Sequence, residues 1–318
     1  MTPNTNRTTR PAPPPAPADE PLGRVGIWTL AFDGQPAGRV REAAAEIEEL
    51  GYGAIWHGEA LGRDTVGQAW LLLSATRRIP VASGIANIAF RDPIAMATAT
   101  RTLGEAFPGR YVLGLGGHRV DDTVHLVDGY PMPARGRAVT TMRGYLDAMD
   151  AVPAHGPRPD PAPRRLLAAL GPKMLELAAH RTRGAHPYFV PVRHTAEARR
   201  IMGPDAFLGV EQAVALDTDP DRARTVATEH VAMYVHGAPH QEANVRRLGF
   251  GDEDITGTPS RRLVDAIVAY GDADRIRERV AEHLAAGADH VCLQVLTASP
   301  SRLPLTAWRE LAPAVLTA

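Results

Sequence analysis

The sequence contains only one cysteine and only one lysine, and the single cysteine excludes two kinds of site. Cys292 has no second thiol with which to form an intramolecular disulfide or a cysteine-built metal site. This pattern suits a reducing compartment, so we predict a cytoplasmic location. Lys173 is the only lysine, and every other Lys/Arg position is arginine, an excess that fits a GC-rich genome.

The sequence also lacks long apolar runs and a strong net charge. No apolar run approaches the roughly 18 residues that a spanning helix needs, and the first residues lack the basic-then-apolar order of a signal peptide. The formal net charge is -1, and the sequence pI is near 6.9. These values argue against a nucleic-acid-binding or membrane-surface protein and favour a small-molecule partner.

The first 21 residues differ in composition from the rest of the chain. They are mainly proline, threonine and alanine, with almost no large apolar side chain. Such a segment cannot offset its ordering entropy, so residues 1–21 are predicted to be a disordered tail. Residues 22–318 are then predicted to form one domain.

Short apolar runs and amphipathic segments alternate through this domain. Eight runs have the length and composition of buried strands: 24–30, 54–59, 79–88, 110–117, 164–170, 185–190, 207–216 and 290–296. Between them lie segments with helical spacing, among them one with Gly51 as its C-terminal stop. In another, Asp92 is the expected N-cap, Pro93 the first helical residue, and Ile94 an inward-facing side chain.

Strands that are apolar on both faces and alternate with helices indicate a parallel sheet. Eight such units predict a closed (β/α)8 TIM barrel, with an open doubly wound sheet as the alternative. Two long connections, 118–135 and 236–272, interrupt the pattern. The second is predicted to be an insertion between strands seven and eight that covers the substrate side of the barrel.

In a barrel of this kind, chemistry is expected where the strands end. His57 and Glu59 alternate at the end of the second run and could transfer a proton, and His118 follows the fourth run. Gly171-Pro172 precedes Lys173 at a strand-to-helix junction, where free backbone N–H groups and a lysine could hold an anion. Ordinary tight turns and a Pro-capped helix start account for the same residues equally well.

Other common sites lack their motifs. The sequence has no phosphate-binding Gly-x-x-x-x-Gly-Lys-Ser/Thr loop and no Gly-x-Ser-x-Gly nucleophile motif. The glycine-rich run at 114–119 does not fit the dinucleotide fingerprint, because residue 119 is arginine. Histidine and carboxylate spacings typical of a metal site are also missing, so no metal is predicted.

Four segments in order resemble the bacterial luciferase-like superfamily, and within it the coenzyme F420-dependent oxidoreductase branch common in actinobacteria. They read AAAEIEELGYGAIWHGEALGRD, VASGIANIAFRDPIAMA, PGRYVLGLGG and ALGPKMLELAAHRTRGAHPYFV. The resemblance spans about residues 23 to 315. It implies a (β/α)8 barrel that holds a flavin-like ring at its C-terminal mouth, and an enzyme that often dimerises through its outer helices.

The resemblance also implies roles for particular residues. A bulge with a non-prolyl cis peptide, expected at Gly84–Ile85, would support the back of the ring. The residues expected to line the cofactor are Ser83, Gly84, Ile85, Gly116, Gly117, Ala169, Gly171, Pro172 and Lys173. Relatives often have Asp-His where this chain has Glu59-Ala60, and Ala60 cannot transfer a proton. Glu59, with His57 or His118, is therefore the expected proton partner.

The resemblance predicts hydride transfer between F420 and an unidentified small organic substrate. One alternative is an FMN-dependent luciferase-like monooxygenase. Another, which the loss of the imidazole at Ala60 favours, is a non-catalytic protein that binds flavin or F420. A homodimer is the expected assembly.

Overall fold

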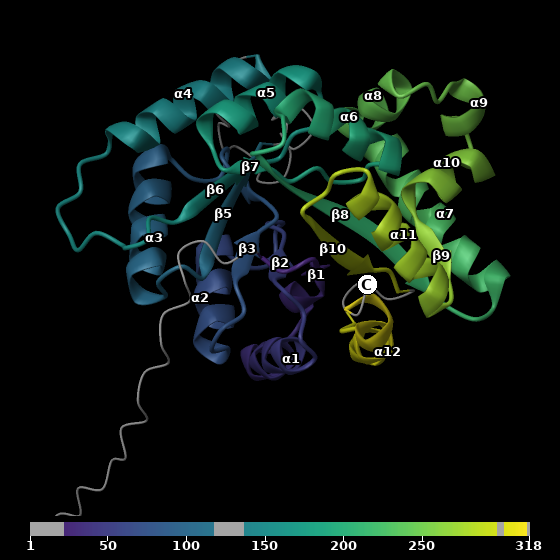
Figure 1. The fold of residues 1–318 in the computed structure, drawn as a ribbon, viewed down its shortest axis with the longest axis horizontal. Coiled ribbons are helices and arrows are strands. Elements are labelled where there is room, and N and C mark those ends of the chain that lie inside the picture. The colour runs from purple at the N-terminus through teal and green to yellow at the C-terminus, as the bar shows by residue number, and fades with distance from the viewer. Residues whose placement is uncertain (1–21, 118–136, 298–301, 317–318) are drawn as a thin grey trace, which may run out of the picture.

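The computed structural model describes residues 22–117, 137–297 and 302–316, and parallel strands lie at its centre (Figure 1). Eight of these strands form the wall of a barrel: β1 (Val25–Thr29), β2 (Ile55–His57), β3 (Val81–Ser83), β5 (Tyr111–Gly116), β6 (Arg164–Leu167), β7 (Gly184–Ala185), β8 (Phe207–Leu216) and β10 (His290–Val295). Each strand pairs in parallel with the next, and β10 closes the ring by pairing with both β8 and β1. The structure confirms the predicted closed barrel and excludes the open sheet.

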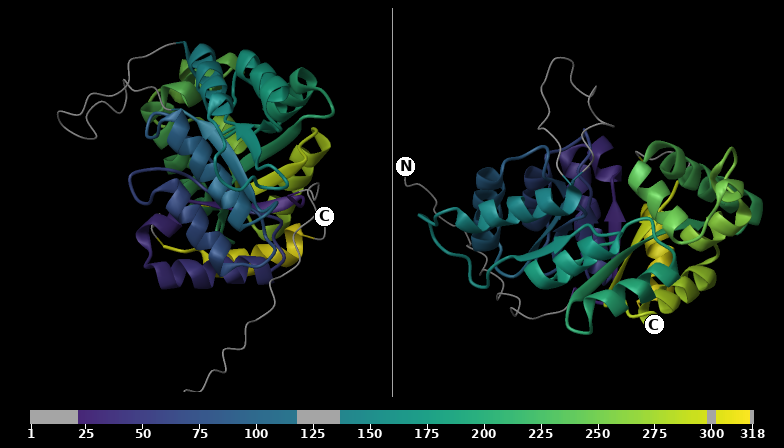
Figure 2. Two further views of the ribbon diagram at one scale, coloured as in Figure 1. Left: turned by 90° about the vertical axis from the view of Figure 1, so that its left-hand side faces the viewer. Right: turned by 90° about the horizontal axis from the view of Figure 1, so that it is seen from above.

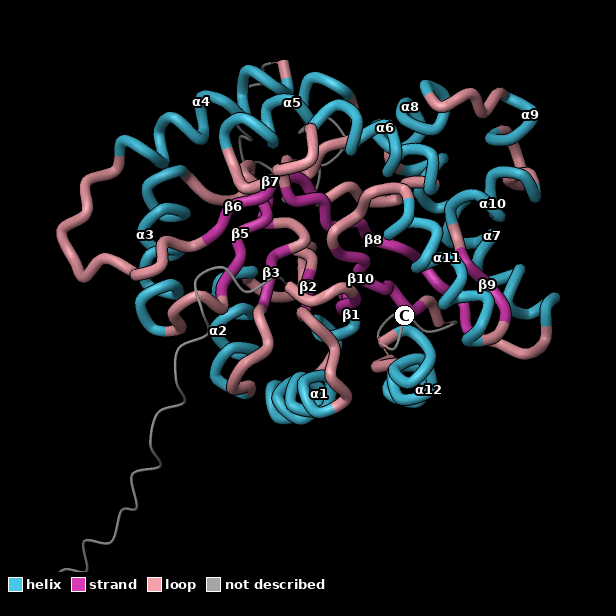
Figure 3. The backbone as a smooth tube through the Cα atoms, in the orientation of Figure 1, coloured by secondary structure: helices cyan, strands magenta, loops and turns pink. Residues whose placement is uncertain are grey.

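Helices surround the strands on the outside of the barrel, as the tube in Figure 3 and the turned views in Figure 2 show. They are the short 3₁₀ helix η1 (Ala31–Gly34), α1 (Ala37–Glu49), α2 (Thr65–Ala75), α3 (Pro93–Ala106), α4 (Ala138–Ala151), α5 (Pro172–Arg181), α6 (Val192–Met202), α7 (Pro220–Gly237), α11 (Ala273–Ala285) and α12 (Leu305–Val315). The predicted tail 1–21 and the connection 118–135, with His118, lie outside the described residues.

Local sequence signals placed several helix ends correctly. Asp92 caps α3 by accepting hydrogen bonds from the backbone N–H groups of Ile94 and Ala95, and Pro93 is the first helical residue. Helix α1 ends at Glu49 with Leu50 as its C-cap, and Gly51 follows with a positive φ of 91°. The inward orientation predicted for Ile94 is wrong, because its side chain is 64% exposed. Met96, two residues further along, is buried in its place.

The predicted insertion between the seventh and eighth barrel strands is present. It contains α8 (Pro239–Arg247), α9 (Asp252–Ile255), α10 (Arg261–Ile267) and the short strand β9 (Ala269–Gly271). β9 extends the sheet by pairing with the C-terminal end of β8. The insertion has its own apolar core with α7, in which Val245, Phe250 and Leu263 are buried.

Side chains fill the interior of the barrel. Trp56, Val112, Leu166 and Cys292, from four strands, belong to one buried cluster. The alternate side chains of the strands pack outward against the helices in a much larger cluster. No helix in the described ranges is long and apolar enough to cross a membrane. The cytoplasmic location that the single cysteine indicates stays a prediction.

Candidate functional site

The third barrel strand carries a bulge at its C-terminal end. Ala82 pairs with Val112, and Ala86 pairs with Leu115. The chain thus advances four residues from Ala82 to Ala86 while β5 advances three, so the third strand contains one extra residue. The Gly84–Ile85 peptide within the bulge is cis, as expected. Beyond it the strand resumes as β4 (Ala86–Asn87), which also pairs with β5.

The bulge is fixed by side chains on both sides. Ser83 is fully buried, and its Oγ donates to the carbonyl of Gly114 at 2.9 Å and accepts from the Gly114 N–H at 3.0 Å. Trp28, on β1, donates from Nε1 to the carbonyl of Gly84 at 2.9 Å. These bonds connect the bulge to β5, which is its neighbour in the sheet, and to β1, which lies on the far side of β2.

Strand β5 lies so close to the bulge that a Cβ at either of two glycines would collide with it, with backbone at Gly114 and with a side chain at Gly116. A Cβ atom on Gly114 would lie 2.0 Å from the carbonyl oxygen of Ser83, and one on Gly116 would lie 2.5 Å from Cγ1 of Ile85. Gly116 is buried, whereas Gly117, the next residue, is exposed. The predicted ring-lining residues Gly84, Ile85 and Gly116 therefore lie together at the mouth of the barrel.

Glu59 is held by contacts within the loops that follow the strands. Its side chain, 3% exposed, forms an ion pair with Arg91 at 2.9 Å. It also accepts hydrogen bonds from the backbone N–H of Asn87 at 2.8 Å and of Thr65 at 3.3 Å. Glu59 thus joins the loop after β2 to the loop after β4, and both carboxylate oxygens have partners.

His57 is buried with no hydrogen-bond partner on either ring nitrogen. Burial lowers its pKa to about 4, against smaller opposing effects of the Gly58 backbone and Asp64, so the ring is neutral at neutral pH. Its neighbour Trp56 points into the barrel, and alternation along β2 directs His57 to the opposite face, toward the helices. In the described residues no hydrogen bond joins His57 to Glu59, because the carboxylate is bonded to Arg91 and to backbone N–H groups.

His186 lies inside the barrel, just beyond β7. Its ring stacks on Trp56 with centroids 4.3 Å apart, and its Nδ1 is 2.9 Å from the carbonyl oxygen of Gly209. A carbonyl only accepts, so Nδ1 carries the proton and Nε2 is left without a partner. A Cβ built on Gly84 would lie 3.0 Å from this Nε2. Burial lowers the pKa of His186 to about 4.

Glu211, in the middle of β8, is a functional candidate that the sequence reasoning missed. Its side chain is buried, Oε2 accepts from the backbone N–H of Phe189 at 2.9 Å, and Oε1 has no partner. Burial raises its pKa to about 8, although the Phe189 bond opposes the shift, so the carboxyl is mainly protonated at neutral pH. A lone carboxylate in the apolar run FLGVEQAVAL was the signal available in the sequence.

Aromatic side chains, among them Tyr188 and Tyr234, lie near Glu211. The Tyr188 hydroxyl donates to Oε1 of Gln294 at 2.7 Å, and it lies 2.7 Å from the hydroxyl of Tyr234 on α7. The Tyr188 ring is 5.1 Å from that of Trp28. Burial raises the pKa of Tyr188 well above its usual value and that of Tyr234 to about 12, so both phenols keep their protons.

The predicted anion junction is the start of α5. Gly171 is the N-cap and Pro172 the first helical residue, with no side-chain cap and no acidic residue in the first turn. Lys173 is exposed and lines a groove of about 420 Å³ between α4 and α5, which it shares with Arg143. Ala169 is buried in the outer core. In the described ranges, no group of three or more His, Cys, Asp or Glu side chains is arranged to hold a metal ion.

The closed parallel barrel, with buried ionisable groups and a bulge at its C-terminal mouth, defines a TIM-barrel enzyme. The chain belongs to the luciferase-like monooxygenase family, whose model matches residues 22–290. It is therefore an enzyme of the luciferase-like type, as the four sequence segments implied.

The chain is also similar to individual proteins in sequence and in fold. The chain is 27% identical to a Mycobacterium tuberculosis protein named "Putative coenzyme F420-dependent oxidoreductase", over 86% of this chain and 95% of that protein. Its fold is similar to that of the coenzyme F420-dependent tetrahydromethanopterin reductase from Methanopyrus kandleri, with a TM-score of 0.74 and 17% identity over 93% and 99% of the two chains. It also resembles the oxygenating constituent of 3,6-diketocamphane monooxygenase of Pseudomonas putida, solved with FMN, with a TM-score of 0.68 and 13% identity over 92% and 99%.

Proposed function

We propose that this enzyme is a coenzyme F420-dependent oxidoreductase that transfers a hydride between F420 and a small organic substrate. The observation that carries the proposal is the bulge at Gly84–Ile85, backed by Gly114 and Gly116, which offers a flat ring a surface with few side chains. The similarity to a mycobacterial protein named for F420 favours this cofactor over FMN.

The residues at the mouth fit such a cofactor. Ile85 is partly exposed beside Gly116, where it can contact one face of a ring. At the start of α5, a Cβ on Gly171 would meet no atom within 4 Å, so the uncapped helix end opens onto free space. We propose that Gly117, Gly171 and Pro172 line the phosphate side and that Lys173 contributes charge there. When bound, the deazaflavin ring supplies or accepts the hydride.

For the proton partner we propose Glu211. Its carboxyl is protonated at neutral pH, and Oε1 has no competing bond inside the barrel. Tyr188 and Gln294 beside it would orient a polar substrate group. Glu59 and His57, the partners favoured by the sequence, fit a positioning role instead: Glu59 is engaged by Arg91, and His57 faces the helices. His118 remains a sequence-based candidate.

Titration of the purified protein with F420 and, separately, with FMN tests the cofactor. We expect F420 to bind at least about ten times more tightly than FMN, and the reduced protein-bound cofactor to be formed or consumed across a panel of alcohols, aldehydes and unsaturated carbonyl compounds. Binding of FMN alone, with NAD(P)H-linked oxygen consumption, would favour the monooxygenase, as for the FMN-bound neighbour. Tight F420 binding without hydride exchange would favour a non-catalytic binding protein.

We further propose a homodimer formed through α2, α3 and the loops before them. The exposed large apolar side chains in the described residues are five, and four of them lie on these neighbouring segments: Leu61, Trp70, Phe90 and Ile94. Light scattering at micromolar concentration should give twice the chain mass, and Ile94→Glu should shift the mass toward the monomer. A monomer at all concentrations contradicts the proposal.

A further inference from the structure

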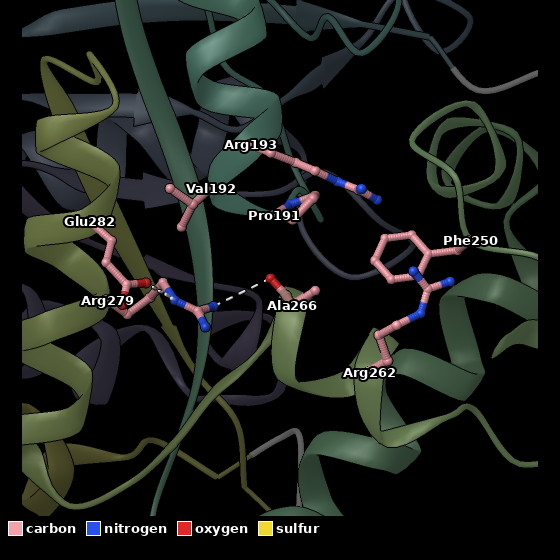
Figure 4. Close-up of a pocket in the computed structure, with 8 residues that line it drawn as sticks. All are labelled: Pro191, Val192, Arg193, Phe250, Arg262, Ala266, Arg279 and Glu282. Atoms are coloured by element: carbon pink, nitrogen blue, oxygen red, sulfur yellow. Dashed lines mark hydrogen bonds and ion pairs between the residues drawn. The ribbon is translucent and has the colours of Figure 1, made fainter.

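A second pocket lies outside the barrel, between α6, α10 and α11. Its volume is about 340 Å³, within the usual range for small-molecule sites. Figure 4 shows its lining, which comes from the start of α6, the loop after α8, and the facing sides of α10 and α11: Pro191, Val192, Arg193, Phe250, Arg262, Ala266, Arg279 and Glu282. None of the residues proposed to hold the cofactor lines it.

Three of the lining side chains are arginines, against one carboxylate. Arg279 is 6% exposed and is fixed by Glu282 at 2.8 Å and by the carbonyl oxygens of Asp265 and Ala266 at 2.8 and 3.3 Å. Arg262 forms an ion pair with the buried carboxylate of Asp254. These contacts hold two guanidinium groups in place at the pocket without any ligand.

Arg193 differs from the other two. Within the described part of the chain its guanidinium has no hydrogen bond or ion pair. It stacks on the ring of Phe250, with Cζ 4.6 Å from the centroid, and Arg262 is at the same distance from that ring. Figure 4 shows the two guanidinium groups beside Phe250 on one side of the pocket, with Arg279 on the other. The ring orients Arg193 and leaves its N–H donors free.

The electrostatics of the pocket favour an anion. Burial lowers the pKa of Arg193, and the positive charges of Arg262 and Arg247 lower it further, although Glu197 opposes them. Helix α6 begins at the pocket with neither a side-chain cap nor an acidic residue in its first turn, so its N-terminus adds positive potential. A bound oxyanion would relieve this repulsion and use the free donors of Arg193.

We propose that this pocket binds a phosphorylated small molecule, with Arg193 as the direct ligand of the phosphoryl group and Arg262 and Arg279 as fixed positive charges. Planar guanidinium groups match a phosphoryl group in bidentate geometry. The pocket, about 340 Å³, is more than ten times the roughly 30 Å³ that one water occupies in the liquid, which leaves space for an organic part. The proposal does not depend on the cofactor bound at the barrel mouth.

Calorimetric titration of the full-length protein without cofactor tests the site, with pyrophosphate and citrate as probes at constant ionic strength. We expect pyrophosphate to bind with one-to-one stoichiometry and more tightly than citrate. Arg193→Gln should weaken pyrophosphate binding by about ten-fold or more. Arg200→Gln, an exposed change on the same helix outside the pocket, should leave it unaltered.

Several outcomes would overturn the proposal. Pyrophosphate binding that is equal in wild type and Arg193→Gln places the anion elsewhere. Tighter binding of citrate than of pyrophosphate contradicts the phosphoryl assignment, and no binding of either probe removes the site. Arg193→Lys keeps the charge but loses the planar donors, and full affinity in that variant would also contradict the bidentate role. Because no F420 is present, failure of this test is distinct from failure of the proposed function.

Discussion

One carboxyl oxygen of Glu211 accepts a hydrogen bond from the backbone N–H of Phe189 at 2.9 Å, while the other oxygen has no hydrogen-bond partner inside the barrel. Phe189 is the one non-glycine residue in the described ranges with a positive φ, 58°. A carboxyl group from β8 thus fixes the turn after β7 and also presents a free oxygen. These two roles can be separated by mutation, because glutamine keeps the accepting oxygen and loses the acid.

Glu211→Gln should therefore remove proton transfer without disrupting the turn. Since the pKa of Glu211 is raised to about 8, the proton-donating reaction of the wild type should decline above pH 8. We expect the variant to have a strongly reduced kcat and no decline of this kind, measured as a pH–rate profile with saturating cofactor. An unchanged profile in the variant would assign the proton to another group.

The same residue should make stability depend on pH between its ordinary pKa and its raised pKa. A carboxyl whose pKa is raised by folding contributes stability that is fully present below its ordinary pKa of 4.5 and is lost as the pH rises through about 8. Between about pH 5.5 and 7 the wild type should lose roughly 1.4 kcal/mol of unfolding free energy per pH unit from this group, and the loss should level off above about pH 8. Urea unfolding should show a flatter dependence in Glu211→Gln, and Glu211→Ala should cost a further 1–3 kcal/mol or so by leaving the Phe189 N–H unpaired.

Buried histidines should make the protein sensitive to acid. Burial lowers the pKa values of His57, His186, His230 and His290 to about 4. A depressed pKa gives stability that is present above the ordinary value of 6.5 and is lost as the pH falls through the folded value. With four such groups, the unfolding free energy should fall by roughly 5 kcal/mol per pH unit near pH 5. Thermal unfolding from pH 7 to 4.5 measures this, and a constant Tm would contradict it.

The close contact between β5 and the bulge predicts that replacing a glycine there by alanine destabilises the protein, whereas the same replacement at an exposed glycine does not. Gly114→Ala should displace the Ser83 carbonyl, because the new Cβ would lie 2.0 Å from its oxygen. We expect a lower Tm and loss of cofactor affinity by about ten-fold or more in fluorescence titration. Gly144→Ala, exposed on α4 with no atom within 4 Å of the new Cβ, should instead stabilise the protein by about 0.5–1 kcal/mol. Equal effects of the two changes would argue against the tight contact.

Removing the charge of Glu59 should destabilise the loops at the C-terminal end of the barrel. Glu59→Gln breaks the ion pair with Arg91 in a nearly buried setting, which should cost about 3 kcal/mol and lower turnover. The comparison is Glu46→Gln, which breaks the surface pair with Arg309 and should cost less than about 1 kcal/mol. If Glu59→Gln abolishes turnover while the unfolding free energy stays at the wild-type value, Glu59 acts in catalysis directly.

Lys173→Ala tests the anion junction at α5. The loss of one positive charge beside the uncapped helix start should weaken F420 binding several-fold, by about 1 kcal/mol, without altering kcat. Arg41→Ala, exposed on α1, serves as the control for net charge. Unchanged affinity in Lys173→Ala would exclude this lysine as a phosphate ligand and leave the helix end as the anion site.

Much of the fold was predictable because its signals are local. The apolar runs gave all eight barrel strands, since a strand buried on both faces needs a continuous run of apolar residues. Asp92 could be assigned as a cap because a capping carboxylate bonds N–H groups two and three residues ahead. The family resemblance, rather than a local signal, placed Gly84, Ile85 and Gly116 together.

The contacts that define the candidate site were decided by tertiary structure. Strand alternation within the closed barrel decided that Gln212 contacts His283 on α11, whereas Glu211 contacts the turn after β7. Glu59 is neutralised by Arg91, which lies 32 residues further along the chain. Local sequence thus determined the helices, strands and caps, because their hydrogen bonds span a few residues. Only barrel closure decided which ionisable groups lost water and which found partners, because burial and pairing depend on segments distant in sequence.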